Sequence, residues 1–510
     1  MFQSLINEWS HFPELLATLP TSLPIWGITF LGALLGYIIG VLPGLGATMG
    51  MVLMLGVVSK IPAELGIALM TSILTSSLCS GGVTASLINI PGTPAAAATC
   101  LDGYPLFKMG KGREAVGAAV TSSALGTTTG LLVILIIQPL IFSIALLLGD
   151  WEIFLFCVFG VLICGALSGD SLWRGLAAGM LGLVFATVGL ESLQAVKRFT
   201  FGTSVLLAGI PEVSALLGLF GLSEVFFTIH NRVKVNKDAV AGVGWMVIPF
   251  KLFKQNIWNM VRSLFVGLWV GFIPGVGESA ACWVSYDVAK RNSKKKELFG
   301  KGSFEGIIAA ETANNASSIG ALIPALSLGI PGSATSAIFI AALFLMDYQP
   351  GPTLMQQAPG IVVKITILAW MGVIMSFAIA LALSKVVTKF FTIPQDYLMP
   401  IVAVLCIVGA WGTGFTKHHI VVLLFFGILG FLMKTHKYPV APMVLGLLIG
   451  KILDTSFRRA LTQYSVDPLQ MFMRPFGIFF TIILIGLFVL GVKSSKKSEE
   501  EKEHADTSSN

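Results

Sequence analysis

The chain has 510 residues, of which 55% are hydrophobic and only 12% are charged. Soluble globular domains carry about 25% charged residues, so this chain has too few polar groups to cover a globular surface. The composition excludes an ordinary soluble domain and predicts an all-α polytopic membrane protein. The net charge of +7 does not indicate nucleic-acid binding, because the basic residues lie in short loops between apolar segments, where cytoplasmic Lys and Arg are expected.

Long apolar runs follow one another from "PIWGITFLGALLGYIIGVL" at residues 24–42 to "FGIFFTIILIGLFVLGV" at residues 476–492. A helix needs about 20 apolar residues to cross the hydrocarbon layer, and on this rule we count roughly 12 crossing or half-crossing segments. The tail from Lys493, "KSSKKSEEEKEHADTSSN", is charged and lacks apolar residues. This composition predicts disorder.

Two helix-breaking motifs occur twice, in the same order. "GVLPGLGATMG" at 40–50 and "GFIPGVGESAA" at 271–281 share Gly-x-x-Pro-Gly-x-Gly. "INIPGTPAAAAT" from Ile88 and "LGIPGSATSAIF" from Leu328 share Ile-Pro-Gly and a following hydroxyl residue. The prolines of the two motifs are 48 residues apart in the first copy and 57 in the second, and the basic loop "AKRNSKKKELFGKG" accounts for the difference. The chain therefore reads as two homologous halves.

The charges of matching loops predict that the two halves are inverted repeats. After the first motif, "SKIPAELG" in the first half is poor in basic residues, whereas its counterpart is "AKRNSKKKELFGKG". After the second motif the bias is reversed, with "FKMGKGRE" against the base-free "MDYQPGPTLMQQAPG". Because Lys and Arg prefer cytoplasmic loops, opposite biases indicate opposite orientations. Lys197-Arg198 and Arg458-Arg459 disagree with this scheme, which puts them outside.

These patterns together predict the organisation of the chain. It comprises an N-terminal interfacial segment (1–23), a first transmembrane repeat (24–229), a basic cytoplasmic linker (230–256), a second, inverted transmembrane repeat (257–452), a loop with a final transmembrane helix (453–492) and a disordered cytoplasmic tail (493–510).

Matched breaks inside apolar helices indicate a binding site. Irregular backbone at membrane depth is tolerated only where protein, water, an ion or a substrate satisfies its polar groups. Helix N-termini attract anionic groups, and carbonyls of an unwound stretch can coordinate Na⁺. The breaks therefore predict an anionic substrate and a cation as cosubstrate. The alternative is that the glycines serve close helix packing, as Gly36-x-x-x-Gly40 does.

Polar side chains within apolar segments point to the same region. In "AAETANNASSIGALIPAL", Glu311, Asn314, Asn315 and Ser318 share one helical face, and Glu278 directly follows the second Pro-Gly-x-Gly. An intramembrane carboxylate is costly and indicates function, so Glu278 and Glu311 are the possible sites of proton or ion coupling. The alternatives are an interfacial glutamate and polar side chains that join helices.

Four stretches resemble one transporter family. "GVLPGLGATMG", "INIPGTPAAAATCLDGYPLFKMGKGREAVGAA", "IPGVGESAA" and "LGIPGSATSA", in this order and spacing, resemble the large membrane subunit of the tripartite tricarboxylate transporters, the TctA family, from about residue 20 to about residue 490. The resemblance implies secondary active uptake of citrate or related organic acid anions across the bacterial cytoplasmic (inner) membrane, coupled to Na⁺ or H⁺. It also implies a transport domain that moves against a scaffold, a small four-helix membrane subunit and an extracytoplasmic solute-binding protein.

The resemblance places residues of both halves around one midplane site for substrate and ion. They are Gly44, Gly46, Thr48, Asn89, Gly92 and Thr93 in the first half, and Gly275, Gly277, Glu278, Ser279, Gly332 and Ser333 in the second. Asn314 and Asn315 of the polar face complete the predicted set. We expect no catalytic residue, metal ligand or cofactor other than the coupling ion.

Two other classes of function remain open. An anion channel could use similar broken helices, as could a carboxylate transporter that works without partner subunits. A membrane enzyme fits less well, because no Ser/His/Asp, H-E-x-x-H or paired-carboxylate pattern is present. Neither glycine-rich motif continues to the G-K-[ST] of nucleotide-binding loops, so we expect an ion gradient to drive uptake.

Overall fold

The computed structural model describes residues 2–42, 45–167, 171–191, 193–231, 244–392 and 395–486. These residues are helical apart from their connecting loops and one two-stranded hairpin. Eight described helices are long and apolar enough to cross a membrane: Leu23–Val41, Ala63–Ile88, Gly112–Ala145, Glu212–Asn231, Ile361–Leu383, Tyr397–Gly414, Lys417–Thr435 and Val440–Gln463. The all-α class and several apolar spans are confirmed, whereas the inversion, the moving domain and the count of 12 stay predictions.

Contacts divide the chain into two compact units. The first unit comprises Met1–Ala145 and Val213–Phe431, and the second comprises Leu146–Glu212 and Leu432–Asn510. Both copies of both helix-breaking motifs belong to the first unit.

The helices of the first unit are α1 (Phe2–Ser10), α2 (Phe12–Thr18), α3 (Leu23–Val41), α4 (Gly46–Val58), α5 (Ala63–Ile88), α6 (Cys100–Lys108), α7 (Gly112–Ala145), α11 (Ser223–Asn231), α12 (Phe250–Gln255), α13 (Ile257–Phe272), α14 (Gly277–Asn292), α15 (Phe304–Gly320), α16 (Leu322–Leu328), α17 (Ala334–Leu345), α18 (Leu354–Gln357), α19 (Ile361–Leu383) and α20 (Gln395–Gly414), with short turns η1 (Leu19–Thr21), η2 (Pro94–Ala96), η4 (Leu217–Leu222), η6 (Lys296–Leu298) and η7 (Val387–Thr392). The second unit holds α8 (Asp150–Leu167), α9 (Leu172–Ala186), the antiparallel strands β1 (Gly189–Leu190) and β2 (Lys197–Arg198), η3 (Val205–Ala208), α22 (Val440–Gln463), α23 (Leu469–Met473) and a helix at Pro475–Gly486. Helices α10 (Glu212–Leu216) and α21 (Lys417–Thr435) cross the boundary between the units along the chain.

The motifs stop and restart helices at corresponding places in the two halves. Gly46 begins α4 with φ +67° and Gly277 begins α14 with φ +71°, a left-handed conformation that favours glycine. Helix α5 ends at Asn89 (φ 57°) and α16 ends at Gly329 (φ 70°), both left-handed, before the two Ile-Pro-Gly turns. In each half the chain therefore follows the order helix, break, helix, loop, helix and Ile-Pro-Gly turn.

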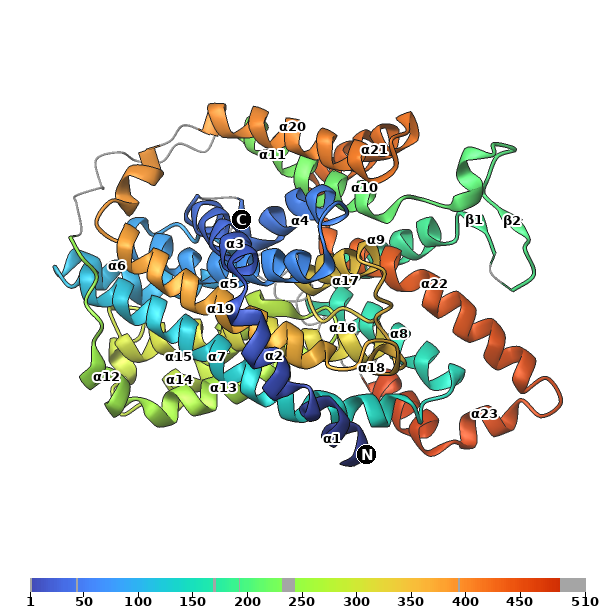
Figure 1. Ribbon diagram of the computed structural model, residues 1–510, viewed down its shortest axis with the longest axis horizontal. Helices are drawn as coiled ribbons and strands as arrows, with labels where there is room; N and C mark the ends of the chain where they lie inside the picture. Colours follow the sequence, from blue (N-terminus) through green and yellow to red (C-terminus); the bar gives the residue numbers. More distant parts are fainter. Residues whose placement is uncertain are drawn as a thin grey trace, which may run out of the picture. The chain divides into compact units, whose positions relative to one another are not determined.

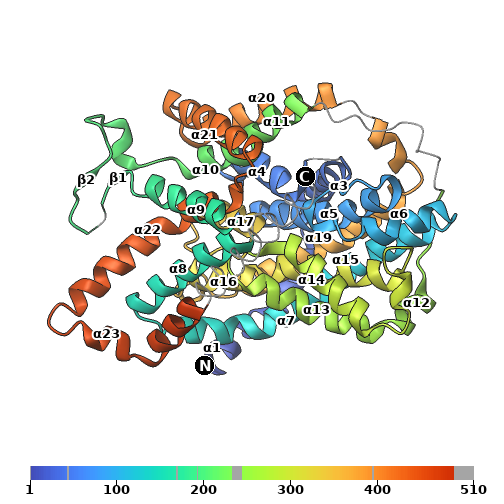
Figure 2. The ribbon, with the colours of Figure 1, turned by 180° about the vertical axis from the view of Figure 1, so that it is seen from behind.

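Glycines let the first and third helices of each half approach closely. A Cβ atom on Gly40 of α3 would clash with the backbone oxygen of Ser77 in α5. A Cβ on Gly271 of α13 would clash in the same way with the backbone oxygen of Ser317 in α15. Figure 1 shows α3 beside α5, and Figure 2 shows α13 beside α15. Glycines at the breaks therefore do allow close helix packing, which was the alternative to a binding role.

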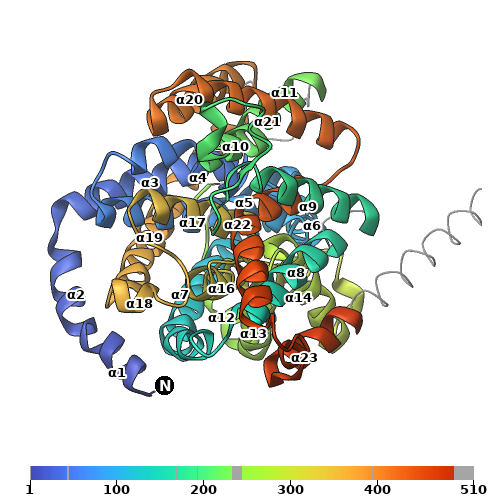
Figure 3. The ribbon, with the colours of Figure 1, turned by 90° about the vertical axis from the view of Figure 1, so that its right-hand side faces the viewer.

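The two Ile-Pro-Gly turns pack against the C-terminal ends of α3 and α13. A Cβ on Gly92 would clash with the carbonyl oxygen of Gly40, and a Cβ on Gly332 would clash with that of Gly271. The segments after these turns cross to the other half: η2 packs against α14, and α17 packs against α4, as Figure 3 shows for α17. The four breaks therefore lie within one network of contacts.

In the second unit, α8, α9 and α22 pack against one another. A Cβ on Gly182 of α9 would clash with the backbone oxygen of Met443, and one on Gly446 of α22 with that of Gly179. Small residues at such a crossing let two helices approach closely within a membrane.

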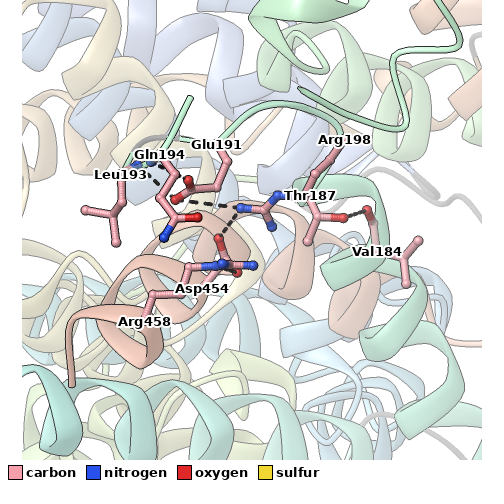
Figure 4. Close-up of polar contacts among 8 residues, drawn as sticks. All are labelled: Val184, Thr187, Glu191, Leu193, Gln194, Arg198, Asp454 and Arg458. Atoms are coloured by element: carbon pink, nitrogen blue, oxygen red, sulfur yellow. Dashed lines mark hydrogen bonds and ion pairs between the residues drawn. The ribbon is translucent and has the colours of Figure 1, made fainter. Parts of the chain in front are cut away.

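Acidic residues of the second unit neutralise two arginines that depart from the loop-charge scheme (Figure 4). Asp454 pairs with Arg198 at 2.8 Å and with Arg458 at 3.0 Å, and the Glu191 carboxylate lies 3.8 Å from Arg198. Both arginines are therefore paired with acidic residues of their own unit.

We expect Gly40→Ala to lower the thermal stability of the protein, because a Cβ there has no room against Ser77 and overpacking costs about 1–3 kcal/mol. Gly27→Ala in the same helix is the matched control, since nothing lies within 4 Å of a Cβ at that position. Thermal unfolding in detergent measures both. Equal midpoints for the two variants would contradict the close approach of α3 to α5.

The loop after β1 should loosen on acidification. The backbone amides of Leu193 and Gln194 donate to the Glu191 carboxylate and, with Arg458 and Arg198, hold its pKa below the ordinary value. A lowered folded-state pKa contributes stability above the unfolded pKa of about 4.3, and that stability is lost as the pH falls through the folded-state value.

Hydrogen exchange at Leu193 and Gln194, corrected for its intrinsic pH dependence, should therefore accelerate in acid. Glu191→Gln should accelerate it at neutral pH, whereas Gln194→Ala keeps both backbone donors and should not. Unchanged protection in Glu191→Gln would count against this role of the carboxylate.

Candidate functional site

The first feature of the site is a pair of helix N-termini without side-chain caps. Neither α4 nor α14 has a side-chain hydrogen bond at its N-cap. Their first-turn amides and the positive ends of their dipoles form the kind of site that attracts anions. Thr48 in the first turn of α4 is half-buried, and Ser279 in the first turn of α14 is exposed. Both residues are therefore at least partly exposed at helix starts that lack a side-chain cap.

Each of these helix starts lies against the Ile-Pro-Gly turn of its own half. The Pro94 Cδ atom lies 3.9 Å from a Cβ built on Gly46, and the Ser333 Cβ lies 3.3 Å from one built on Gly277. The Thr93 hydroxyl is buried and has no hydrogen-bond partner within the described part of the chain. The structure thus brings Gly46 and the turn of Thr93 together, and separately Gly277 and Ser333.

Glu278 is held at the N-terminus of α17. Its carboxylate is buried and accepts a hydrogen bond from the Thr335 hydroxyl. The Thr335 and Ser333 hydroxyl oxygens are 2.9 Å apart, and Ser333 forms a reciprocal capping box with Ser336. The hydroxyls of Ser333, Thr335 and Ser336 therefore have hydrogen-bond partners, whereas that of Thr93 at the corresponding turn has none among the described residues.

Glu311 lies in a fully buried group of neutral donors. Its carboxylate accepts hydrogen bonds from the Thr99 hydroxyl at 2.6 Å, the Ser123 hydroxyl at 2.9 Å and the Asn314 amide at 3.2 Å. No ion pair to Glu311 occurs among the residues that the structure describes. Burying a charged carboxylate without a countercharge costs free energy, so this environment favours either protonation of Glu311 or a cation bound beside it.

The two asparagines of the polar face bind other parts of the protein. The Asn314 amide also donates to the Ala95 carbonyl at 3.0 Å. The Asn315 amide donates to the Asn314 side-chain oxygen and to the Glu311 carbonyl, and the Thr127 hydroxyl donates to the Asn315 oxygen. All four amide N–H groups thus have protein partners, as expected of side chains that join helices.

The remaining predicted residues have separate positions. Gly44 lies outside the described residues. Asn89 is exposed at the end of α5, and Gly275 is half-buried in the break with φ +78°. Gly92 and Gly332 pack on the ends of α3 and α13. Glu278 and Glu311 have different hydrogen-bond partners, so the structure shows two carboxylate environments.

Sequence reasoning assigned no role to Thr99, Ser123, Thr335 or Asp102. Asp102 is buried, and it accepts hydrogen bonds from the backbone amides of Gly300, Gly302 and Ser303 at 2.8–2.9 Å and from the Tyr286 hydroxyl at 2.8 Å. Burial raises the pKa of Asp102, although these donors act in the opposite direction. The only sequence signal was an aspartate within the conspicuous stretch "CLDGYP". Asp102 ties α6 to the loop between α14 and α15.

Comparison with known proteins gives two consistent findings. A family model described as "Tripartite tricarboxylate transporter TctA family" matches residues 27–445. An uncharacterized 52.8 kDa protein in the TAR-I ttuC' 3' region of Agrobacterium vitis is 30% identical over 476 residues, which cover 93% of this chain and 94% of the relative. An uncharacterized protein in the TAR-II ttuC' 3' region of the same organism is 29% identical over 226 residues, or 43% of this chain and 93% of the relative. No solved structure matches.

Removing the Glu311 carboxylate should destabilise the protein. Glu311→Ala leaves two hydroxyls and an amide without their acceptor, at about 1–3 kcal/mol for each buried group that stays unpaired. Glu311→Gln keeps one acceptor oxygen, so it should lower the stability of the protein less than Glu311→Ala does. Glu305→Gln, in the first turn of the same helix, is the control. Stability is measured by thermal unfolding. Equal unfolding midpoints for Glu311→Ala and Glu311→Gln would contradict the arrangement of donors around the Glu311 carboxylate.

Proposed function

The chain belongs to the tripartite tricarboxylate transporter TctA family, and we propose that it is the permease through which tricarboxylates or related organic acid anions cross the membrane. Membership of the family makes it a component of a tricarboxylate transporter. One observation carries the proposal for the site. The uncapped N-termini of α4 and α14 lie against the two Ile-Pro-Gly turns in a single compact unit.

Substrate carboxylates would bind at these two helix starts. The first-turn amides of α4 and α14 supply donors, and the accessible Thr48 and Ser279 hydroxyls supply two more. Asn89 is exposed at the end of α5, where its side-chain amide can also donate. A substrate with several carboxylates can therefore be bound by residues from both halves.

A cation must accompany this anion. None of the contacts described at the four breaks involves a lysine or an arginine, and helix dipoles supply only partial charges. An inward gradient of Na⁺ or H⁺ would both offset the charge and drive uptake. Glu278 and Glu311 are the buried carboxylates of this region and stay the proposed sites of coupling.

The wider arrangement follows from the family. Its name describes a tripartite system, and we place this chain as its large subunit in the bacterial cytoplasmic membrane. A small four-helix membrane subunit and an extracytoplasmic solute-binding protein would complete the system. The matched breaks of the two halves and their opposite loop charges support inverted repeats, in which a transport domain moves against a scaffold.

Citrate uptake should weaken when the hydroxyls at the helix starts are removed. Thr48→Val and Ser279→Ala should each raise the KM for citrate about tenfold, because a hydrogen bond to a charged group contributes about 1.5–3 kcal/mol. Uptake is measured in proteoliposomes that contain the chain with its small subunit and binding protein, under an inward Na⁺ or pH gradient.

Ser59→Ala, one residue past the other end of α4, and Ser293→Ala, one residue past the other end of α14, are the matched controls and should leave KM unchanged. A wild-type KM in both test variants would place the substrate elsewhere. Flux that neither saturates nor depends on the gradient would instead indicate an anion channel.

A further inference from the structure

One face of α12 and α13 combines basic and aromatic side chains at helical spacing. We define the α13 stripe as Lys254, Trp258, Arg262, Phe265 and Trp269. Successive members are three or four residues apart, and residues at this spacing lie on one face of a helix. Backbone hydrogen bonds continue through the junction of the two helices, because the Asn256 carbonyl accepts from the Met260 amide at 3.0 Å and the Asn256 amide donates to the Leu252 carbonyl at 2.9 Å.

The described parts of the chain leave this stripe uncovered. The side chains of Trp258, Phe265 and Trp269 are 81%, 60% and 68% exposed, and Lys254 is exposed as well. The opposite face of α13 packs on α15, where a Cβ on Gly267 would clash with the Ala313 backbone oxygen. A continuous exposed face with large apolar side chains marks a contact with a membrane or with another protein.

Arg262 is the one charged residue in the sequence of α13. Its Nη2 atom donates to the Asn259 side-chain oxygen at 2.7 Å, whereas its buried Nε has no hydrogen-bond partner among the described residues. Neither Arg262 nor Lys254 forms an ion pair within the part of the chain that the structure describes. An arginine within an apolar helix is costly, so donors without acceptors at this position indicate an anionic ligand.

Asn259 holds the Arg262 guanidinium in place. The buried Asn259 side chain donates through its amide to the Glu305 carbonyl of α15 at 3.0 Å, and its oxygen accepts from Arg262. Because both ends of the Asn259 amide are bonded, its contact with α15 fixes the position of the guanidinium. Arg262 is thus a pre-organised donor, and a planar guanidinium matches the oxygens of a phosphate.

The order of side chains along the stripe matches that of the groups in a phospholipid. Arg262 lies five residues after Ile257, the first residue of α13, which is about 7.5 Å along the helix axis. Lys254 precedes this start, and the apolar Phe265 and Trp269 follow Arg262. Tryptophan is enriched at the level of lipid headgroups, and long basic side chains near a helix end reach that level. A lipid therefore fits the stripe better than a protein, which would have to bury an acidic side chain against Arg262.

We propose that the α13 stripe binds an anionic phospholipid, with its phosphate on Arg262, its remaining negative charge near Lys254 and an acyl chain along Phe265 and Trp269. The linker 230–256, which loop charge predicts to be cytoplasmic, leads directly into α13. The cytoplasmic leaflet carries a negative surface potential, and basic groups beside a membrane helix recognise its anionic headgroups. This lipid site is separate from the helix starts at which we propose that the substrate binds.

Fluorescence quenching by brominated lipid tests the proposal. The purified full chain is reconstituted into mixed vesicles of phosphatidylglycerol and phosphatidylcholine, with bromine on the acyl chains of one lipid or of the other. The difference between the wild type and Trp258→Phe gives the fluorescence of Trp258. We expect brominated phosphatidylglycerol to quench Trp258 more strongly than the same fraction of brominated phosphatidylcholine does. Because the bromine is on the acyl chain, free phosphate cannot produce this signal.

Three variants locate the headgroup. Arg262→Gln should lower the association constant for phosphatidylglycerol relative to phosphatidylcholine about tenfold, since it removes a charge-assisted hydrogen bond. Lys254→Gln should lower it about fivefold, and because Lys254 is exposed this variant tests the site even if Arg262→Gln does not fold. Lys290→Gln removes an exposed charge from the last turn of α14, so it is the matched control and should keep the wild-type preference.

Three results would overturn the lipid site. The first is equal quenching of wild-type Trp258 by the two brominated lipids, and the second is a preference that neither Arg262→Gln nor Lys254→Gln changes. The third is loss of the quenching when the small subunit is bound, which would make this face a protein interface. A preference that persists in that complex supports the lipid. None of these measurements involves citrate, so their outcome is independent of the proposed transport function.

Discussion

The close approach of an Ile-Pro-Gly turn to the end of a broken helix is the constraint on which the site depends. Gly92 and Gly332 leave no room for a side chain against the carbonyl oxygens of Gly40 and Gly271. Because the turn is held there, the next segment starts beside the restarted helix of its own half, at Gly46 or at Gly277. That segment then packs on the other half, as η2 on α14 and α17 on α4. Two backbone contacts thus connect all four breaks within the first unit.

A broken helix offers two kinds of binding group at once. Where it stops, carbonyl oxygens lack donors, and where it restarts, amides lack acceptors. Here Gly40 and Gly271, near the ends of α3 and α13, are buried, whereas at the restarts Thr48 is half-buried and Ser279 is exposed. The accessible helix starts therefore suit the proposed anion better than the buried helix ends do. Partial charges of the backbone also avoid the cost of placing several lysines or arginines within a membrane.

The two halves share a backbone plan but differ in their charges. Glu278 and Glu311 of the second half correspond to Ala47 and Thr71 of the first. The first half contributes the unpaired Thr93 hydroxyl, and it also supplies Thr99 and Ser123, which donate to Glu311. The carboxylate of one half is therefore held by hydroxyls of the other. The proposed coupling at Glu311 would therefore involve residues of both halves.

The sequence predicted the helices and their breaks, which depend on neighbouring residues, and it missed the hydrogen-bond partners that only tertiary contacts bring together. Hydropathy predicted the helices, and the repeated motifs predicted where they break, because proline and glycine act on their own neighbours. Helical periodicity placed Glu311 on a polar face, with an interfacial position as the alternative. Its donors Thr99 and Ser123 lie 212 and 188 residues away along the chain, so no pattern in a single sequence identifies them. Close packing and ligand binding are the two roles that the sequence allows for the glycines. In the structure, Gly92 packs against the Gly40 carbonyl oxygen, so the packing role is present, and it holds the Ile-Pro-Gly turn beside the break at which binding is proposed.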